Sequence, residues 1–246
     1  FLVRERHILT CAHVISSALG LASDDAPSDY DHDAVYLNFP LLAPGSYFGT
    51  QVCHWQPDTD IAGLKMSSDG PEGANAVRLV THEDLWGHPF RAIGFPAGRS
   101  DGVWTSGVLR GRTAAGWVQI DDVKEPGYWV QPGFSGTPIW DEQLNGVVGM
   151  AVAAEADQTI KAAYMIPADA LAEAWPGAVR VHQAAPRRAE TTPESGGVTI
   201  GDVTGGIHGS TIAGRDVHIH GGPRRWQSPR GTGSLSGSVD LIKLRE

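Results

Sequence analysis

The stretch Ile8-Leu-Thr-Cys-Ala-His-Val14 joins a short β-prone run to a histidine that lies between alanine and valine. A neutral imidazole can act as a general base, provided that a nucleophile and an orienting carboxylate lie within reach. Two later stretches offer these groups: Asp58-Thr-Asp-Ile-Ala-Gly-Leu-Lys65 and Gly133-Phe-Ser-Gly-Thr-Pro138. The order along the chain is therefore histidine, aspartate, serine, and each motif gains meaning from the other two.

The chemistry explains these three residue types. A serine hydroxyl is a poor nucleophile, so Ser135 needs His13 to take its proton during attack and to return it to the leaving amine. Asp60 would hold the imidazole tautomer, and it is favoured over Asp58 because Ile-Ala follows it directly. Gly133 lacks a side chain, so the N–H groups of Gly133 and Ser135 are predicted to form the oxyanion hole.

Composition and local pattern predict an all-β domain. The 246 residues include 31 Gly and 16 Pro, and charged residues make up only 19%, which favours short strands joined by turns. Alternating runs occur at 34–39, 116–120 and 127–131, with turn residues between them. The best helix is Pro167-Ala-Asp-Ala-Leu-Ala-Glu-Ala-Trp175, which begins with proline and is followed by Pro-Gly.

The three motifs in this order resemble the chymotrypsin/trypsin-like serine peptidase family, over about residues 1–175. Subtilisins and α/β-hydrolases use a different order. The resemblance implies two six-stranded antiparallel β-barrels with a short C-terminal helix, followed here by a Gly-rich β-prone tail. It also implies a polypeptide substrate and a mechanism that needs no metal and no organic cofactor. Because the run at Phe1 is already apolar, the first strand of the first barrel is expected upstream of it.

The resemblance further implies residues that bind the substrate. The strand 146–152 follows the serine and would border the cleft, where it pairs with the peptide backbone. Trp129 stands six residues before Ser135, at the expected base of the primary specificity pocket. The predicted substrate-binding residues are Trp129, Pro132, Gly149, Met150 and Ala151.

Two positions depart from the secreted, zymogen-activated members of the resembled family. Phe134 replaces the aspartate that pairs with a new N-terminus after zymogen cleavage, so this activation switch is not expected. Trp129 replaces the aspartate that selects Lys or Arg in trypsin, so that preference is not supported. Whether Glu155 or Asp157 reaches the pocket stays open at the level of the sequence.

The composition changes after the predicted helix, and a Gly-rich segment follows. The predicted parts are a peptidase domain over 1–178, a linker over 179–197, a Gly-rich β-prone motif over 198–222 and a flexible basic tail, or a link to a further domain, over 223–246. The pattern Gly-Ser-Thr-Ile-Ala-Gly-Arg-Asp-Val at 209–217 resembles motifs of bacterial, more narrowly actinobacterial, multidomain conflict and NLR-like proteins. Two interpretations stand: homotypic self-assembly through 198–222, or a Gly-rich linker or small β appendage. His218 and His220 would lie on one face of a strand, but without a third ligand they predict no metal site.

The charge and cysteine content of the chain limit the kinds of binding partner and the cellular compartment that are expected for it. Residues 1–179 carry 10 Lys/Arg against 22 Asp/Glu, which argues against a nucleic-acid partner. No run of 18 apolar residues occurs, so no membrane partner is predicted. Two cysteines, Cys11 and Cys53, fit a reducing, cytoplasmic compartment better than a secreted disulfide framework. They are interpreted as buried small hydrophobes, and a disulfide between them stays open.

Two classes of function fit these observations. The first is a serine endopeptidase that works through an acyl-enzyme intermediate, in an intracellular regulated or defence-associated protease module. The second is a catalytically silent module that binds extended peptides or takes part in assembly. The intact set of His13, Asp60, Ser135 and Gly133 favours the first.

Overall fold

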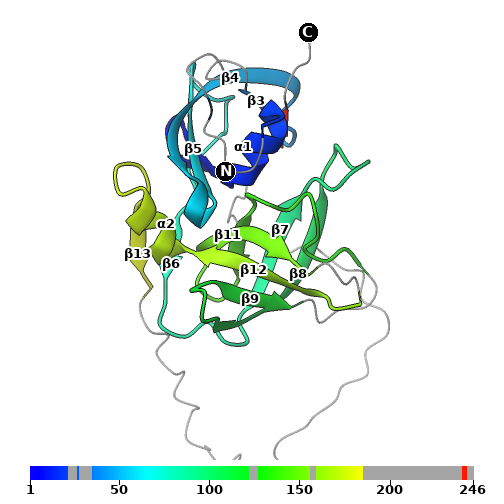
Figure 1. Cartoon of the computed structure of the whole chain (residues 1–246), viewed down its shortest axis with the longest axis vertical. Coiled ribbons are helices and arrows are strands. Elements are labelled where there is room, and N and C mark those ends of the chain that lie inside the picture. The colour runs from blue at the N-terminus through cyan, green and yellow to red at the C-terminus, as the bar shows by residue number, and fades with distance from the viewer. Residues whose placement is uncertain (22–26, 28–34, 122–126, 156–158, 185–239, 243–246) are drawn as a thin grey trace, which may run out of the picture. The chain divides into compact units, whose positions relative to one another are not determined.

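The computed structural model describes residues 1–21, 27, 35–121, 127–155, 159–184 and 240–242 (Figure 1). The predicted linker beyond 184, the motif at 198–222 and the rest of the tail lie outside these residues. The helices are α1 (Ala12–Leu19) and α2 (Ala168–Ala174), with a 3-10 turn η1 (Pro57–Thr59). The strands are β1 (Leu2–Arg4), β2 (His7–Thr10), β3 (Val35–Phe39), β4 (Ala43–Gln56), β5 (Ile61–Met66), β6 (Leu79–Thr81), β7 (Pro89–Gly94), β8 (Val103–Arg112), β9 (Val118–Asp121), β10 (Pro138–Asp141), β11 (Gly146–Ala154), β12 (Ala162–Pro167), β13 (Val181–Gln183) and β14 (Asp240–Ile242).

The second half of the chain forms a closed barrel. Its six strands follow the order β10-β7-β8-β9-β12-β11, and pairing of β11 with β10 closes the ring (Figure 1). Every pair in the ring is antiparallel. Burial alternates along β8, as expected for strands with one face in the core. Strands β6 and β13 extend the sheet by parallel pairing next to β11.

The first half forms a six-stranded antiparallel sheet in the order β1-β2-β5-β4-β3-β14. Ile15 and Leu19 of α1 pack with Leu37 and Leu64 of the sheet in one apolar cluster. The all-β, chymotrypsin-like class and the short C-terminal helix α2 are therefore confirmed. The predicted barrel in this half differs in one respect, since no described pairing joins its edge strands β1 and β14.

The edge strand β14 was not expected from the sequence, which assigns its residues to a tail. Leu241 pairs with Leu37 of β3, and the two strands run antiparallel. An edge strand exposes unpaired N–H and C=O groups, and a further extended segment satisfies them. This explains why a segment remote in sequence forms the sixth strand. Among the described residues, no helix is long and apolar enough to cross a membrane.

A shared apolar cluster joins the two halves. Leu9 and Ile61 of the first sheet pack with Met150 and Ile166 of the barrel and with Leu171 of α2. Burying such side chains stabilises the fold by about 1.5–3 kcal/mol each. The cluster therefore holds β2 and β5 in place against β11.

Trp175, directly after α2, fixes the helix to the first sheet. Its ring stacks on His54 at 5.2 Å between centroids and meets His7 edge-on at 5.8 Å. A Cβ atom on Gly63 of β5 would overlap this ring. The absence of a side chain at Gly63 therefore makes room for the tryptophan.

Gly63→Ala is expected to lower the free energy of unfolding by about 1–3 kcal/mol, the usual effect of overpacking a core. Urea unfolding followed by circular dichroism measures the change. Gly49→Ala is the matched control, because a Cβ there would meet Ser67 Oγ at an ordinary 3.6 Å. Equal stability of the two variants would contradict the role assigned to Gly63.

Stability is also expected to fall as the pH drops from 7.5 to 5.5. Burial lowers the pKa of His7 and of His54 below the usual value, and nearby Lys65 adds to the effect at His7. Both rings carry a buried nitrogen without a partner among the described residues. Near pH 6.5 the unfolded chain therefore binds protons that the folded chain does not, so acid favours unfolding.

Urea midpoints measured across this pH range test the expectation. The double variant His7→Gln/His54→Gln should show a weaker dependence on pH than the parent protein. An identical dependence in both proteins would show that these two histidines are not its source.

Candidate active site

The structure brings His13 and Asp60 together. His13 lies in the first turn of α1, where its backbone N–H donates to Asp60 Oδ1 at 2.9 Å. Its ring Nδ1 lies 2.6 Å from Asp60 Oδ2. Two hydrogen bonds from one residue orient the carboxylate and leave Nε2 as the free nitrogen of the ring.

The turn before β5 aims Asp60 at the histidine. The 3-10 turn η1 ends at Asp60, whose φ of 56° is left-handed and whose N–H donates to Pro57 O at 2.9 Å. Aspartate tolerates this conformation better than most residues. Asp58, the rival candidate, instead lines a separate cavity with Trp117 and Glu173.

Ser135 sits in a tight loop that three backbone hydrogen bonds hold. Phe134 N–H donates to Gln131 O at 3.0 Å, Gly136 N–H to Ala151 O at 2.9 Å and Thr137 N–H to Phe134 O at 3.0 Å. Gly136 has φ +81°, and a Cβ there would overlap Thr10 Oγ1. The loop is thus closely packed against β2 and β11, and these contacts fix where Ser135 stands.

The backbone N–H groups of Gly133 and Ser135 differ from that of Phe134, which lies between them, in their hydrogen bonding. Among the described residues neither N–H finds an acceptor, whereas that of Phe134 does. Gly133 has φ +101°, and a Cβ there would lie 2.7 Å from Phe95 O. Phe95 N–H in turn donates to Gly133 O at 2.8 Å. The loop therefore presents two unpaired donors beside the serine.

The ring of Phe134, next to the serine, packs into the core of the barrel and holds the loop in place. It is fully buried, and a Cβ on Gly94 of β7 would overlap it. The position that carries an aspartate in zymogen-activated enzymes here carries an apolar anchor.

Two cavities meet at His13 and Ser135. One has a volume of about 390 Å³ and includes Val14, Phe95 and Gly133 in its wall. The other has about 220 Å³; its wall is formed by His13, Val130, Gln131, Pro132, Ser135, Ala151, Val152, Ala153 and Ala154. No hydrogen bond joins Ser135 to His13 among the described residues, and in substrate-free enzymes such contacts are often loose.

The predicted substrate-binding residues fall into two groups. Pro132 and Ala151 line the smaller cavity. Met150 is fully buried in the core, a Cβ on Gly149 would lie 2.5 Å from Ile166 O, and neither residue lines the cavity. Trp129 does not line the cavity either, and its ring lies 5.4 Å from Lys161 Nζ.

The cavity wall that the sequence interpretation missed lies further along the same strand. Val152, Ala153 and Ala154 line the cavity, and the register of β11 against β12 shifts between Ala151 and Ala153. An irregularity of this kind changes which side chains face the cleft. A run of four small apolar residues before Glu155 was the available signal.

Both cysteines are free thiols. Cys11 is fully buried, its Sγ lies 3.4 Å from Ala151 O, and it is within 4.8 Å of ligand atoms of His13 and Asp60. Burial, and next the charge of Asp60, raise the pKa of the Cys11 thiol well above its usual value. The Cys11 thiol, which lies next to His13 and Asp60, is therefore neutral and packs as a small buried side chain.

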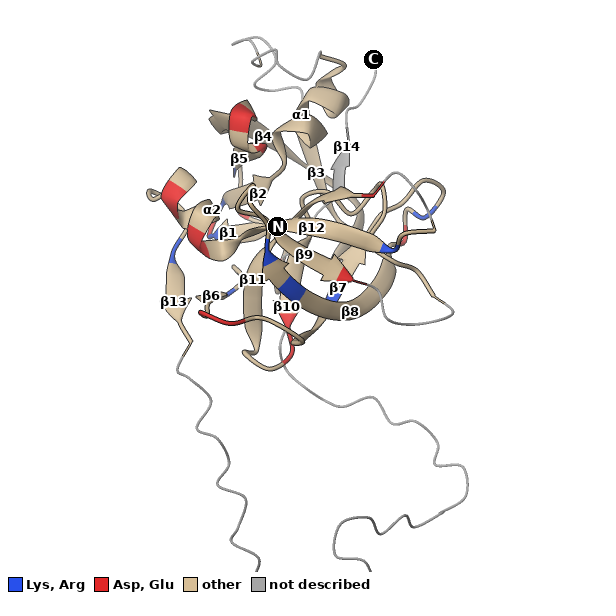
Figure 2. Ribbon diagram, turned by 60° about the horizontal axis from the view of Figure 1, so that its bottom comes forward, with Lys and Arg blue, Asp and Glu red and all other residues tan. Residues whose placement is uncertain are grey.

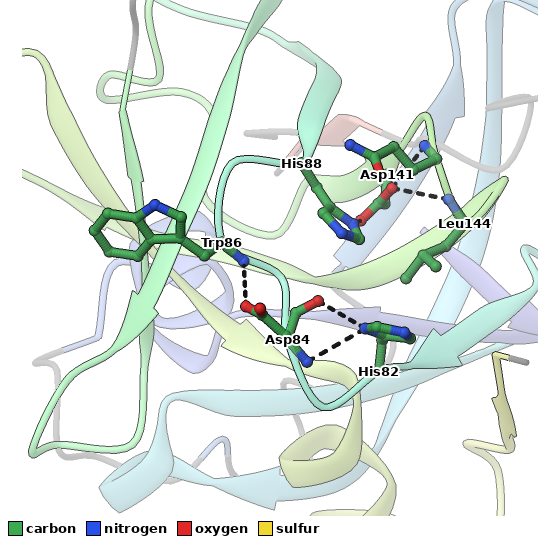
Figure 3. Close-up of polar contacts among 7 residues, drawn as sticks. His82, Asp84, Trp86, His88, Asp141 and Leu144 are labelled. Carbon is green, nitrogen blue, oxygen red and sulfur yellow. Dashed lines mark hydrogen bonds and ion pairs between the residues drawn. The ribbon is translucent and has the colours of Figure 1, made fainter. Parts of the chain in front are cut away.

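A second histidine–aspartate pair has a different setting (Figure 3). His88 Nδ1 lies 2.7 Å from Asp141 Oδ2, and Asp141 Oδ1 accepts from the N–H groups of Gln143 and Leu144 at 2.8 and 2.9 Å. Asp141 is fully buried at the end of β10. Neither member of this pair lines the cavities shared by His13 and Ser135. The pair stabilises the turn between β10 and β11.

A closed antiparallel barrel beside a second antiparallel sheet, with a histidine and a serine on one cleft, is the arrangement typical of chymotrypsin-like serine proteases. A family model described as the trypsin-like peptidase domain matches residues 1–150, and the chain belongs to this family. The resemblance drawn from the three motifs is confirmed at this level.

Two solved structures illustrate the likeness. One is an inactive form of Rv3671c from M. tuberculosis H37Rv with a serine-to-alanine substitution; it is 18% identical, with a TM-score of 0.49, over 72% of this chain and 79% of that one. The other is Deg5, 22% identical with a TM-score of 0.47, over 72% of this chain and 80% of that one. A search among curated proteins finds no significant match.

Proposed function

We propose that this chain is a serine endopeptidase in which Ser135 is the nucleophile, His13 the general base and acid, and Asp60 the residue that orients His13. One observation carries the proposal: His13, which is hydrogen-bonded to Asp60, lines both of its cavities together with Ser135. The alternative histidine–aspartate pair lacks this relation to the serine.

The proposed reaction follows from the placement of these groups. Ser135 Oγ attacks the carbonyl carbon of the peptide bond while His13 Nε2 takes the hydroxyl proton. The free N–H groups of Gly133 and Ser135 receive the oxyanion. The carbon–nitrogen bond then breaks, and the imidazolium gives its proton to the leaving amine. Water, activated by the same histidine, hydrolyses the acyl-enzyme and restores the hydroxyl.

The free edge of β11 supports binding of an extended peptide. Strand β10 pairs with Gly146, Val147, Gly149 and Met150 only. On that edge, the backbone of 152–154 has no partner strand among the described residues, and its side chains line the cavity. A substrate strand can add to such an edge by backbone hydrogen bonds.

Fluorophosphonate labelling of the purified protein tests the proposal. The native protein is expected to label with one reagent per chain, at Ser135, and Ser135→Ala is expected to abolish labelling. Labelling that survives this substitution would exclude Ser135 as the nucleophile. Absence of labelling in the native protein, with binding of extended peptides retained, would favour the silent peptide-binding module.

The proposal extends to the setting of the protease. An intracellular, regulated or defence-associated module of a bacterial multidomain protein is supported by the free thiols at Cys11 and Cys53 and by the sequence pattern at 209–217. Control by homotypic assembly through 198–222 belongs to this proposal. A thioflavin response of the isolated peptide 196–222 is its test, and a peptide that stays monomeric at high concentration would refute it.

A further inference from the structure

The smaller cavity at Ser135 has an apolar wall. Gln131 is the one polar contributor besides His13 and Ser135, and the apolar residues of the wall are Val130, Pro132, Ala151, Val152, Ala153 and Ala154. None of these wall residues except His13 carries a titratable group. An apolar wall favours an apolar ligand, because burial removes nonpolar surface from water.

The described surroundings also provide no counter-charge. Strand β11, which supplies much of the wall, has no charged residue over 146–154, and Figure 2 shows it without a coloured segment. Glu155 follows directly, but its Oε1 accepts the hydroxyl of Tyr164 at 2.7 Å, and this bond raises the pKa of Tyr164. Glu155 does not line the cavity, so it does not supply a carboxylate for a basic side chain.

From this wall we infer that the enzyme selects an uncharged, apolar side chain in the acyl-side residue of the cleaved bond, whose carbonyl carbon Ser135 attacks. The inference rests on the proposed function. A charged side chain would lose its hydration in this cavity without a partner of opposite charge, which is costly. The amide of Gln131 offers hydrogen bonds but no neutralising charge.

Four peptides that differ only at the acyl-side residue test the inference: leucine, valine, lysine and glutamate. We expect kcat/KM for leucine and valine to exceed the values for lysine and glutamate by about 100-fold or more, since the discrimination comes from a desolvated charge. A value for lysine or glutamate within tenfold of that for leucine would overturn the inference.

Variants locate the source of the preference. Ala154→Asp adds a carboxylate to a partly exposed part of the wall, and the ratio of lysine to leucine cleavage should rise by about tenfold or more. Ala114→Asp adds the same charge to an exposed turn and should leave the ratio unchanged. An unchanged ratio in Ala154→Asp, or an altered one in Ala114→Asp, would contradict the assignment of this wall.

Fluorophosphonate labelling separates the two proposals, because the reagent carries no acyl-side residue. A protein that labels at Ser135 but prefers a charged substrate would refute the apolar selectivity and leave the protease proposal intact. A protein that neither labels nor cleaves any of the four peptides would refute both the protease proposal and the apolar selectivity.

Discussion

Asp60→Asn is expected to lower kcat by about four orders of magnitude with little change in the fold. The carboxylate accepts hydrogen bonds from both the backbone N–H and the ring Nδ1 of His13. Asparagine has one acceptor oxygen, so its NH₂ group would face Nδ1 and donate to it. The ring proton would then move to Nε2, where the imidazole needs a lone pair to accept the proton of Ser135.

Asp60→Asn changes the hydrogen-bonding chemistry of the side chain and keeps the backbone conformation at residue 60. Asp60 has a left-handed φ of 56°, and asparagine adopts this region readily. Active-site titration gives the enzyme concentration, and steady-state rates then give kcat. Urea unfolding checks that the variant is folded.

Asp58→Asn is the matched control, because it removes the same charge two residues earlier. Asp58 lines a cavity that includes neither His13 nor Ser135, so its kcat should stay within about twofold of the parent value. A large loss in Asp58→Asn together with a small loss in Asp60→Asn would assign the orienting role to the other aspartate.

Gly133→Ala is expected to lower kcat/KM by about 100- to 1000-fold, the usual effect of losing one oxyanion donor. A methyl group at this position would lie 2.5 Å from Pro96 Cα and 2.7 Å from Phe95 O. Both contacts are backbone atoms that cannot rotate away, so the loop must shift. Such a shift moves the N–H of Gly133 away from the oxyanion while His13 and Asp60 stay in place.

Gly98→Ala separates this steric effect from the cost of a left-handed alanine. Gly98 has a φ of +79°, but nothing lies within 4 Å of its Cβ position. In Gly98→Ala the free energy of unfolding should fall by about 1 kcal/mol, and kcat/KM should stay close to the parent value. If Gly133→Ala retained more than half of the parent activity, the N–H of Gly133 would not be an oxyanion donor. Rates of fluorophosphonate labelling provide an independent measure, since phosphonylation uses the same hole.

The fold class was accessible from short motifs and composition. Alternating runs, abundant Gly and Pro and one Pro-capped helix sufficed for an all-β fold with α2 at its end. The position of β14 was not accessible, because pairing between residues about 200 positions apart leaves no local pattern. The relation of Asp60 to His13 was predicted from the residues that follow it, and the left-handed turn that aims its carboxylate became visible only in the structure.

The wall of the smaller cavity was likewise predicted only in part from the sequence. Of the residues that the resemblance implies for substrate binding, Pro132 and Ala151 line the 220 Å³ cavity, whereas Trp129, Gly149 and Met150 do not. The register shift between Ala151 and Ala153 changes the face on which Ala153 and Ala154 lie, and these two wall residues were not predicted. The ring of Trp129 instead lies 5.4 Å from Lys161 Nζ, a contact that spacing along the chain does not encode.

The motif Ile8–Val14 thus determined one part of the description of this protein, and the folded chain determined the other. The family and the order of the three reactive groups could be read from it and its two companions, because nucleophile, base and orienting carboxylate require particular residue types. The lining of the 220 Å³ cavity and the two unpaired amides beside Ser135 came only from the folded chain. These features depend on how distant segments pack and which backbone groups they leave free, and short-range sequence patterns do not specify either.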